Sequence, residues 1–259
     1  MSCRRVMAGL LGLLFAGLLT AADNPFLGTW KLNAAKSDFT GETITFEPAG
    51  SKMVRYSSGG MSYTFTTDGK PHAGMFDRTV SVKEVDGNHW ERTTMYKGKT
   101  LAKASFELSP DGKTLTEMVK GTNPDGSSFA ETTVYEREGD GSGMMGKWKS
   151  KDVKEDSESI LEYADNGEDG LAFILPKIKG KCLVKYDGKD YPAVGPTVPA
   201  GLTLAVTKTG DRSIEMTEKV KGKPIYKATY TVSDDGKTLT SKGSPVTVNE
   251  STTAVYDRQ

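Results

Sequence analysis

The chain has 259 residues, of which 26% are charged and 36% are hydrophobic, and its 34 basic side chains balance 34 acidic ones. A chain without net charge has no general electrostatic attraction for nucleic acid, so nucleic acid is not an expected partner. The length is sufficient for two domains of ordinary size.

The first 22 residues have the features of a secretory signal peptide. Arg4 and Arg5 precede an apolar run over residues 6–19, and small residues end at Ala22. The run is shorter than the roughly 20 residues that a bilayer-spanning helix needs. The sequence therefore predicts a cleaved leader at 1–22 and a secreted or periplasmic mature chain without a membrane span.

The sequence contains two cysteines, and one of them, Cys3, belongs to the predicted leader. The mature chain then keeps Cys182 alone and can form no internal disulfide, so burial has to stabilise its fold. We expect Cys182 to be a small buried hydrophobic residue rather than a reactive thiol.

Two copies of one module follow the leader, with their motifs in the same order. "GTWKLNAAKSDF" from Gly28 matches "GKWKSKDVKEDS" from Gly146, "SPDGKTLT" matches "SDDGKTLT", and the closing "VYERE" matches "VYDRQ". A displacement of about 120 residues exceeds the roughly 20 to 50 residues of solenoid and propeller repeats, so the repeated unit is a whole domain. The Gly-rich "EREGDGSGMMG" has the composition of a linker. The predicted division is a first domain at 23–138, a linker at 139–145 and a second domain at 146–259.

Alternating apolar and polar residues predict β-strands throughout both copies. In "KTLAKASFELS", Ala104, Phe106 and Leu108 share one face, and Lys103 and Glu107 share the other. Each copy gives roughly eight or nine such strands, separated by turn signals, and no amphipathic helix. Strands with one apolar face close most economically into a barrel, although a sandwich remains an alternative. The predicted fold class is all-β, with two tandem small antiparallel up-and-down β-barrels.

"FLGTWKL" near the mature N-terminus resembles the G-x-W opening of the lipocalins and the related fatty-acid-binding proteins, the calycin superfamily, and "GKW" at Gly146 is similar. The patterns "GTWKLN…KS…F" and "YDGKDYP" also resemble small secreted bacterial lipocalin-like proteins. In calycins an arginine of the last strand lies over the tryptophan of the first strand and closes one end of the barrel. The resemblance therefore implies lipocalin-like barrels in which Arg137 lies over Trp30 and Arg258 lies over Trp148, each as a cation–π contact.

Aligning the copies suggests a pocket in the first barrel. The alignment matches Trp90, Arg92 and Tyr96 of the first copy with Ile214, Met216 and Val220 of the second. Because the second set is apolar, the first set is expected to face inward as well. An inward arginine is costly unless an acid or anion pairs with it. By resemblance to fatty-acid-binding proteins, Arg92 and Tyr96 would hold the head group of an anionic amphipath. The candidate apolar wall consists of Met61, Tyr63, Phe65, Val80, Val82, Trp90 and Phe106. Alternatively, Arg92 lies at the rim or is neutralised by an inward carboxylate such as Glu84.

The sequence shows no cluster that points to catalysis. His72, expected in a surface loop, and His89, expected on a strand, have no partner at metal-ligand spacing. "GSGMMG" fits the dinucleotide pattern G-x-G-x-x-G but lacks the strand before it and the helix after it. No G-x-S-x-G elbow occurs. We therefore expect no enzyme activity, no cofactor and no metal.

The leading functional expectation is that one or both barrels bind a small apolar or amphipathic molecule, because an eight-stranded barrel is just wide enough for side chains or one small ligand. The alternative is a pair of filled barrels, which serves as an exported scaffold or envelope module and interacts with protein or glycan through its loops. The sequence leaves the oligomeric state open.

Overall fold

The computed structural model describes residues 24–155, 158–167 and 169–259. The predicted leader therefore lies outside the described residues. The chain is all-β, as predicted: the described residues form strands β1 to β20 and one turn of 3₁₀-helix, η1 (Ala34–Lys36), without an α-helix. No helix within the described ranges is long and apolar enough to cross a membrane.

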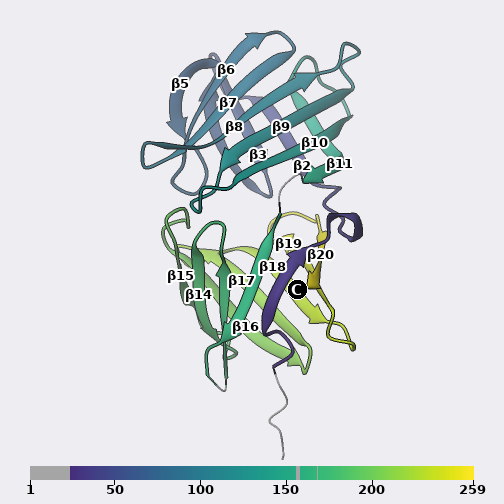
Figure 1. The fold of residues 1–259 in the computed structure, drawn as a ribbon. Coiled ribbons are helices and arrows are strands. Elements are labelled where there is room, and N and C mark those ends of the chain that lie inside the picture. The colour runs from purple at the N-terminus through teal and green to yellow at the C-terminus, as the bar shows by residue number, and fades with distance from the viewer. Residues whose placement is uncertain (1–23, 156–157, 168) are drawn as a thin grey trace, which may run out of the picture.

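The strands form two antiparallel barrel-shaped sheets of ten strands each, stacked end to end (Figure 1). Barrel 1 contains β2 (Thr43–Pro48), β3 (Met53–Ser58), β4 (Met61–Thr66), β5 (Asp68–Ala73), β6 (Thr79–Asp86), β7 (His89–Tyr96), β8 (Lys99–Leu108), β9 (Thr114–Thr122), β10 (Ser128–Glu138) and β11 (Gly146–Glu155). Barrel 2 contains β1 (Gly28–Leu32), β12 (Ile160–Asp165), β13 (Gly170–Leu175), β14 (Gly180–Lys185), β15 (Tyr191–Val194), β16 (Leu202–Gly210), β17 (Ser213–Val220), β18 (Lys223–Val232), β19 (Thr238–Pro245) and β20 (Thr252–Arg258). Each barrel thus has ten strands instead of the eight or nine read from the sequence.

Barrel 2 is a closed ring of hydrogen-bonded strands, whereas the sheet of barrel 1 begins at β4 and ends at β5. His72 bridges these two end strands, because its Nε2 lies 3.2 Å from the backbone nitrogen and 2.8 Å from the hydroxyl of Thr66. His72 therefore lies on a strand instead of in the predicted surface loop. His89 lies on β7, as predicted.

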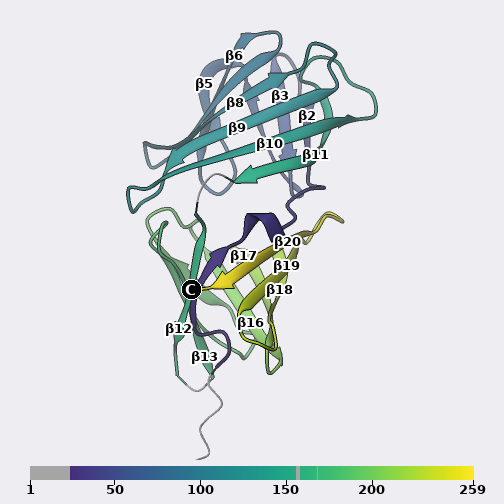
Figure 2. The same ribbon diagram turned by 45° about the vertical axis from the view of Figure 1, so that its right-hand side comes forward.

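The first strand of each copy belongs to the barrel of the other copy. Trp30 of β1 pairs with Leu161 of β12 and with Arg258 of β20. Trp148 of β11 pairs with Ile44 of β2 and with Arg137 of β10. Figure 2 shows β11 beside β10. The predicted division at 139–145 is therefore wrong in its assignment of strands. The contiguous residues 43–155 form barrel 1, and they are inserted between the first and second strands of barrel 2.

The Gly-rich segment 139–145 is not a linker between barrels but the connection from β10 to β11. Met144 in this segment is buried, and its carbonyl accepts a hydrogen bond from Trp148 Nε1 at 3.0 Å. The carbonyls of Gly143 and Met145 each accept a hydrogen bond of 2.6 Å from the Arg137 guanidinium. The segment thus caps one end of barrel 1.

The exchange of first strands also corrects the predicted arginine–tryptophan pairs. The Arg137 guanidinium lies 4.0 Å from the ring centroid of Trp148, and the Arg258 guanidinium lies 4.1 Å from that of Trp30. The cation–π contact implied by the resemblance is present at both barrel ends, but between the other two combinations of residues. The physical reason is that an arginine of a last strand stacks on the first strand hydrogen-bonded beside it, and that strand comes from the other copy.

The repeated "DGKTLT" turn orients each of these arginines. The carbonyl of Gly112 accepts a hydrogen bond from Arg137 Nε at 2.7 Å, and that of Gly236 accepts one from Arg258 Nε at 2.5 Å. The glycine of the G-x-W opening is required for the same contact. Gly28 has a φ of +128°, and a Cβ there would lie 2.9 Å from Arg258 Nη1, so any other residue would be strained and would collide with the guanidinium.

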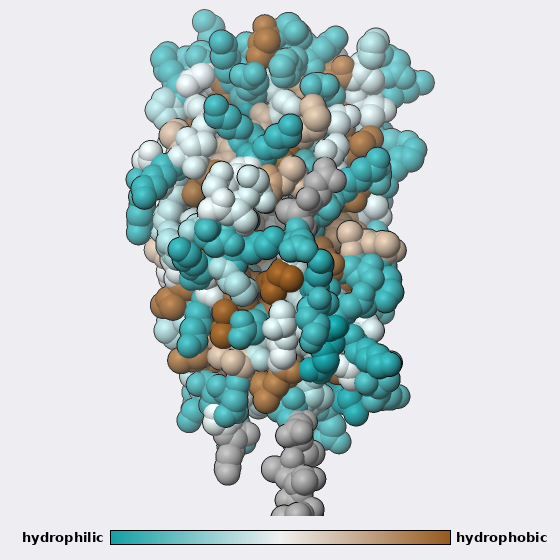
Figure 3. Space-filling model, viewed as in Figure 1, coloured by the Kyte–Doolittle hydropathy of each residue, from teal (hydrophilic) through white to brown (hydrophobic). Residues whose placement is uncertain are grey.

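Each barrel has its own aromatic-rich core. The buried residues of barrel 1 lie between Ile44 and Trp148, and those of barrel 2 include Phe26 and Trp30 together with residues 161–239. The predicted alternation on β8 is confirmed, because Ala104, Phe106 and Leu108 are buried. The outer faces are mostly hydrophilic, with scattered apolar residues on the face that Figure 3 shows.

Candidate ligand-binding site

The alternation of β7 turns Arg92 into barrel 1. Trp90 and Tyr96 on the same face are buried, and Glu91 on the other face is exposed. The cross-strand neighbours of Arg92 are Val82 on β6 and Ala104 on β8, both buried. The side chain of Arg92 is 16% exposed, so a permanent positive charge lies among apolar side chains.

Glu117 on β9 neutralises this charge. Its Oε1 lies 2.7 Å from Arg92 Nη2, and its side chain is 8% exposed. The structure therefore agrees with the alternative in which an inward carboxylate pairs with Arg92, but that carboxylate is Glu117. Glu84 is exposed and accepts a hydrogen bond from the Thr67 hydroxyl at 3.2 Å. The contact between Arg92 and Glu117 is a charge-assisted hydrogen bond, which is about twice as strong as a hydrogen bond between neutral groups.

Tyrosines surround the ion pair. The Tyr135 hydroxyl donates a hydrogen bond to Glu117 Oε2 at 3.1 Å. The Arg92 guanidinium lies 5.8 Å from the ring centroid of Tyr56 and 5.1 Å from that of Phe106. Together these residues form a polar network inside an aromatic shell. We refer to Arg92, Glu117, Tyr56, Tyr63 and Tyr135 as the polar centre.

The pKa shifts at the polar centre follow from burial and from the ion pair. Burial alone would lower the pKa of Arg92, but the charge of Glu117 and its contacts with Tyr56 and Tyr63 raise it. Burial, followed by the nearby charge of Glu117, raises the pKa of Tyr56 and Tyr135. At neutral pH the arginine therefore carries its charge and these tyrosines keep their protons.

Tyr96 is not a neighbour of Arg92 in this network, although the alignment had suggested that the two act together. Its ring is buried, and the cations over it are Arg78, at 4.5 Å from the ring centroid, and Lys97, at 5.0 Å. The tyrosines that accompany Arg92 come from β3, β4 and β10 instead.

Most of the predicted apolar wall surrounds the polar centre. Trp90 meets Phe65 edge to face at 6.0 Å between ring centroids, and Phe46 meets Phe106 at 5.5 Å. Tyr63 lies 5.2 Å from Tyr56. Met61 is an exception, because it lines a separate cavity between the two barrels.

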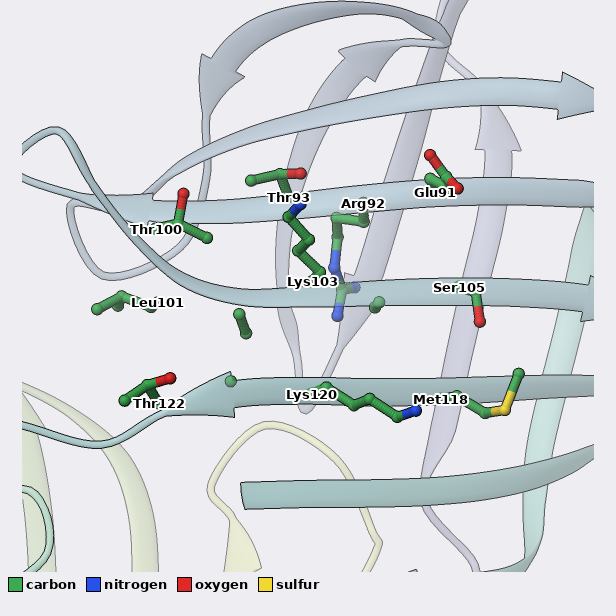
Figure 4. Close-up of a pocket in the computed structure, with 13 residues that line it drawn as sticks. Glu91, Arg92, Thr93, Thr100, Leu101, Lys103, Ser105, Met118, Lys120 and Thr122 are labelled. Atoms are coloured by element: carbon green, nitrogen blue, oxygen red, sulfur yellow. The ribbon is translucent and has the colours of Figure 1, made fainter. Parts of the chain in front are cut away.

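A hollow of about 670 Å³ lies beside Arg92 along β7, β8 and β9, and its lining includes Glu91, Thr93 and Lys103 of the outer face of these strands (Figure 4). Arg92 is among the residues that line it, together with Ala102, Ala104 and Gly121. Exposed charged side chains, among them Lys103 and Lys120, surround the hollow. A volume in this range suits a small organic ligand.

Sequence reasoning missed Glu117, Tyr56 and Tyr135. The alternation of "TLTE" carried a usable signal for Glu117, since it puts the carboxylate on the same face as the buried Leu115. Only the placement of β3, β9 and β10 around the ring shows which residues meet Arg92.

Barrel 2 lacks the ion pair at the equivalent positions. Arg92 pairs with Ala104 across β7 and β8, and Met216 pairs with Ala228 across β17 and β18 in the same register. Ser241, which is buried, stands where barrel 1 has Glu117. The same scaffold is thus built with a methionine and a serine in place of two charges.

The other candidate chemistries do not extend the site. Within the described ranges no three His, Cys, Asp or Glu side chains are placed to hold a metal ion. Cys182 is buried, as expected, and burial raises the pKa of its thiol to about 11, so the thiolate nucleophile is disfavoured at neutral pH. Comparison of the chain with protein-family models, curated proteins and solved structures finds no match.

Proposed function

We propose that the protein is an exported, non-enzymatic, lipocalin-like binding protein, and that barrel 1 holds a small amphipathic molecule with its polar or anionic group beside Arg92. The observation that carries this proposal is the buried Arg92–Glu117 pair, which barrel 2 replaces with Met216 and Ser241. A buried ion pair is weak evidence for stability, because well-packed neutral residues often do as well or better. Barrel 2 supplies that neutral version, so the scaffold itself does not require the charges.

The surrounding contacts suggest how a ligand would be held. An anionic head group would share the Arg92 guanidinium with Glu117, whose second oxygen already has the Tyr135 hydroxyl as a donor. The apolar part of the ligand would lie against Trp90 and Phe106. Such an arrangement satisfies both the charge and the hydrophobic part of an amphipath.

The test uses the residues of barrel 2 as a guide. The double substitution Arg92→Met with Glu117→Ser copies the neutral pair and keeps the site free of an uncompensated charge. We expect it to weaken binding of dodecanoate by about tenfold or more relative to the unaltered protein, measured by calorimetry, because a charge-assisted contact is lost. Glu84→Gln, which alters an exposed carboxylate, is the control and should bind as the unaltered protein does. Equal affinity in all three proteins would contradict the proposal.

The alternative function, a scaffold with filled barrels, is favoured by the dense packing of rings, since Phe46 lies 5.5 Å from both Trp90 and Phe106. Organic extraction of the purified protein followed by mass spectrometry separates the two functions. A stoichiometric amphipath in the extract supports ligand binding. No extracted molecule together with no dodecanoate binding supports the scaffold.

A further inference from the structure

A second cavity, of about 290 Å³, lies where the two barrels meet. It is separate from the polar centre and shares no lining residue with the hollow beside Arg92. Barrel 1 contributes the β3–β4 hairpin and the β5–β6 loop, and barrel 2 contributes β17, β18 and the end of β19. The lining residues are Gly59, Met61, Phe76, Glu218, Ile225, Tyr226 and Pro245. The cavity is therefore apolar apart from one carboxyl and one phenol.

Glu218 lies on the inner face of β17. The residues that alternate with it on that face, Ile214 and Met216, are buried. Glu218 pairs with Leu204 across β16 and β17, in the register in which Thr94 pairs with Val80 in barrel 1. The barrel scaffold thus accepts a neutral threonine at the equivalent position, so it does not require a carboxylate there.

No cation of the chain neutralises Glu218 within the described residues. The two lysines nearest to it in sequence are engaged elsewhere, since Lys219 pairs with Asp190 at 2.6 Å and Lys221 with Asp77 at 3.2 Å. Burial raises the pKa of Glu218, and no charged neighbour contributes to the shift. A carboxylate in such a place is costly unless a cation joins it.

The two aromatic walls of the cavity come from different surroundings. The Tyr226 ring packs against Gly243, where a Cβ would lie 2.2 Å from the tyrosine hydroxyl, and that hydroxyl is 3.3 Å from Thr252 Oγ1. Phe76 on the opposite side has a φ of +56°, which is unusual for a bulky residue and requires support from its surroundings.

Contacts between the barrels surround the cavity and fix its two sides. Arg78 Nη2 donates a hydrogen bond to the Thr197 carbonyl at 2.6 Å, and the Asp77–Lys221 ion pair also joins the two barrels. The Thr247 hydroxyl lies 3.5 Å from the Gly59 carbonyl. The cavity is therefore built from both barrels.

We propose that this cavity binds a small organic cation with a quaternary ammonium group, with the charge beside Glu218 and the alkyl groups against Tyr226, Phe76 and Met61. A quaternary ammonium group has no N–H and requires no hydrogen-bond acceptor. One carboxylate can neutralise its charge, and apolar or aromatic surfaces can contact its alkyl groups. The stabilisation of such cations by aromatic faces increases when water is excluded.

The experiment uses two probes of the same shape, choline and 3,3-dimethylbutan-1-ol, which differ by the positive charge. Binding to the full mature chain is followed by NMR through the methyl shifts of Met61 and Ile225. We expect choline to bind at least about tenfold more tightly than the alcohol, and Glu218→Gln to remove most of this difference. Glu215→Gln, an exposed carboxylate on the outer face of the same strand, should keep it.

A second variant protects the test against an unexpected effect of Glu218→Gln on folding. Ile225→Trp fills part of the cavity and leaves Glu218 in place, and it should abolish the choline-induced shift of the Met61 methyl group. The proposal is overturned if choline and the alcohol bind equally, if Glu218→Gln binds choline as tightly as the unaltered chain, or if Ile225→Trp retains the Met61 shift. The dodecanoate site contains none of these residues, so failure here leaves the test of the Arg92 site independent.

Discussion

The guanidinium groups of Arg137 and Arg258 each lie over a tryptophan ring and donate hydrogen bonds to backbone carbonyls at one end of a barrel. Arg258 lies over the Trp30 indole and donates hydrogen bonds to the carbonyls of Pro25, Leu27 and Gly236. The carbonyls of Pro25 and Leu27 belong to the segment that enters β1, and that of Gly236 belongs to the turn between β18 and β19. One side chain thus connects the first and the last strand of barrel 2. Lysine could not replace it, because a single ammonium lacks the planar set of donors.

A double-mutant cycle tests which tryptophan belongs to which arginine. We expect Trp30→Leu and Arg258→Met to be coupled by about 0.5–2 kcal/mol in the free energy of unfolding, as for a cation–π contact. Trp30→Leu and Arg137→Met should be additive within about 0.5 kcal/mol, because those residues lie in different barrels. Urea denaturation of the four proteins in each cycle gives the coupling. The single Arg258 change will exceed the coupling, since it also leaves three carbonyls without a donor. Coupling between Trp30 and Arg137 instead would contradict the strand exchange.

Much of the residue-level arrangement could be predicted because the copies inform each other. The inward orientation of Arg92 followed from the apolar residues that match its neighbours in the second copy. Its partner Glu117 lies 25 residues away on another strand, and the alternation of β9 alone could not show that the two side chains meet. The acid that pairs with a buried arginine depends on strand order and register, which local patterns do not specify.

At the scale of elements, the exchanged strands β1 and β11 are the feature that sequence could not supply. Both begin with G-x-W, so the sequence motif is compatible with a place beside either last strand. The duplication made the barrels easy to recognise. Because the two copies are so similar, however, the sequence does not show which barrel contains which first strand. The register of β1 with β12 and β20 decides the question.

Proline substitutions in the two first strands separate the barrels experimentally. Lys31 and Lys149 occupy matching positions in β1 and β11, each paired with a strand on both sides. Proline in a central strand removes a ladder hydrogen bond, because it has no backbone N–H, and is therefore strongly disfavoured there. We expect Lys31→Pro to reduce hydrogen-exchange protection in β12 and β20 and to leave β2 and β10 protected.

Lys149→Pro is the matched control and should have the opposite pattern, with protection lost in β2 and β10. If Lys31→Pro instead exposed the strands of barrel 1, β1 would belong to its own copy.

At the scale of the whole molecule, barrel 1 is an insertion in barrel 2. Its ten strands and its core come from residues 43–155 without interruption. The two chain segments that flank the insertion are neighbours, because the Leu32 backbone N–H donates a hydrogen bond to the Ser159 carbonyl at 2.9 Å. Domains inserted in this way are commonly able to fold alone, since their ends lie close together.

Two shortened chains test this architecture. A chain of residues 41–155 should fold with a single cooperative urea transition, and so should a chain in which a short Gly-rich connection replaces residues 34–157. Circular dichroism and tryptophan fluorescence follow the transitions, since each fragment keeps one of the closing tryptophans, Trp148 or Trp30. A fragment 41–155 that stays unfolded at all urea concentrations would show that barrel 1 depends on barrel 2.

The pairing of β1 with β20 has a mechanical consequence. These strands lie next to the two ends of the described chain and are hydrogen-bonded side by side. Tension applied between the N-terminal and C-terminal ends is therefore carried first by the ladder between these two strands. Barrel 1 bears no load until β1 has been peeled from its neighbours, so it is shielded from pulling forces that would already have begun to open barrel 2.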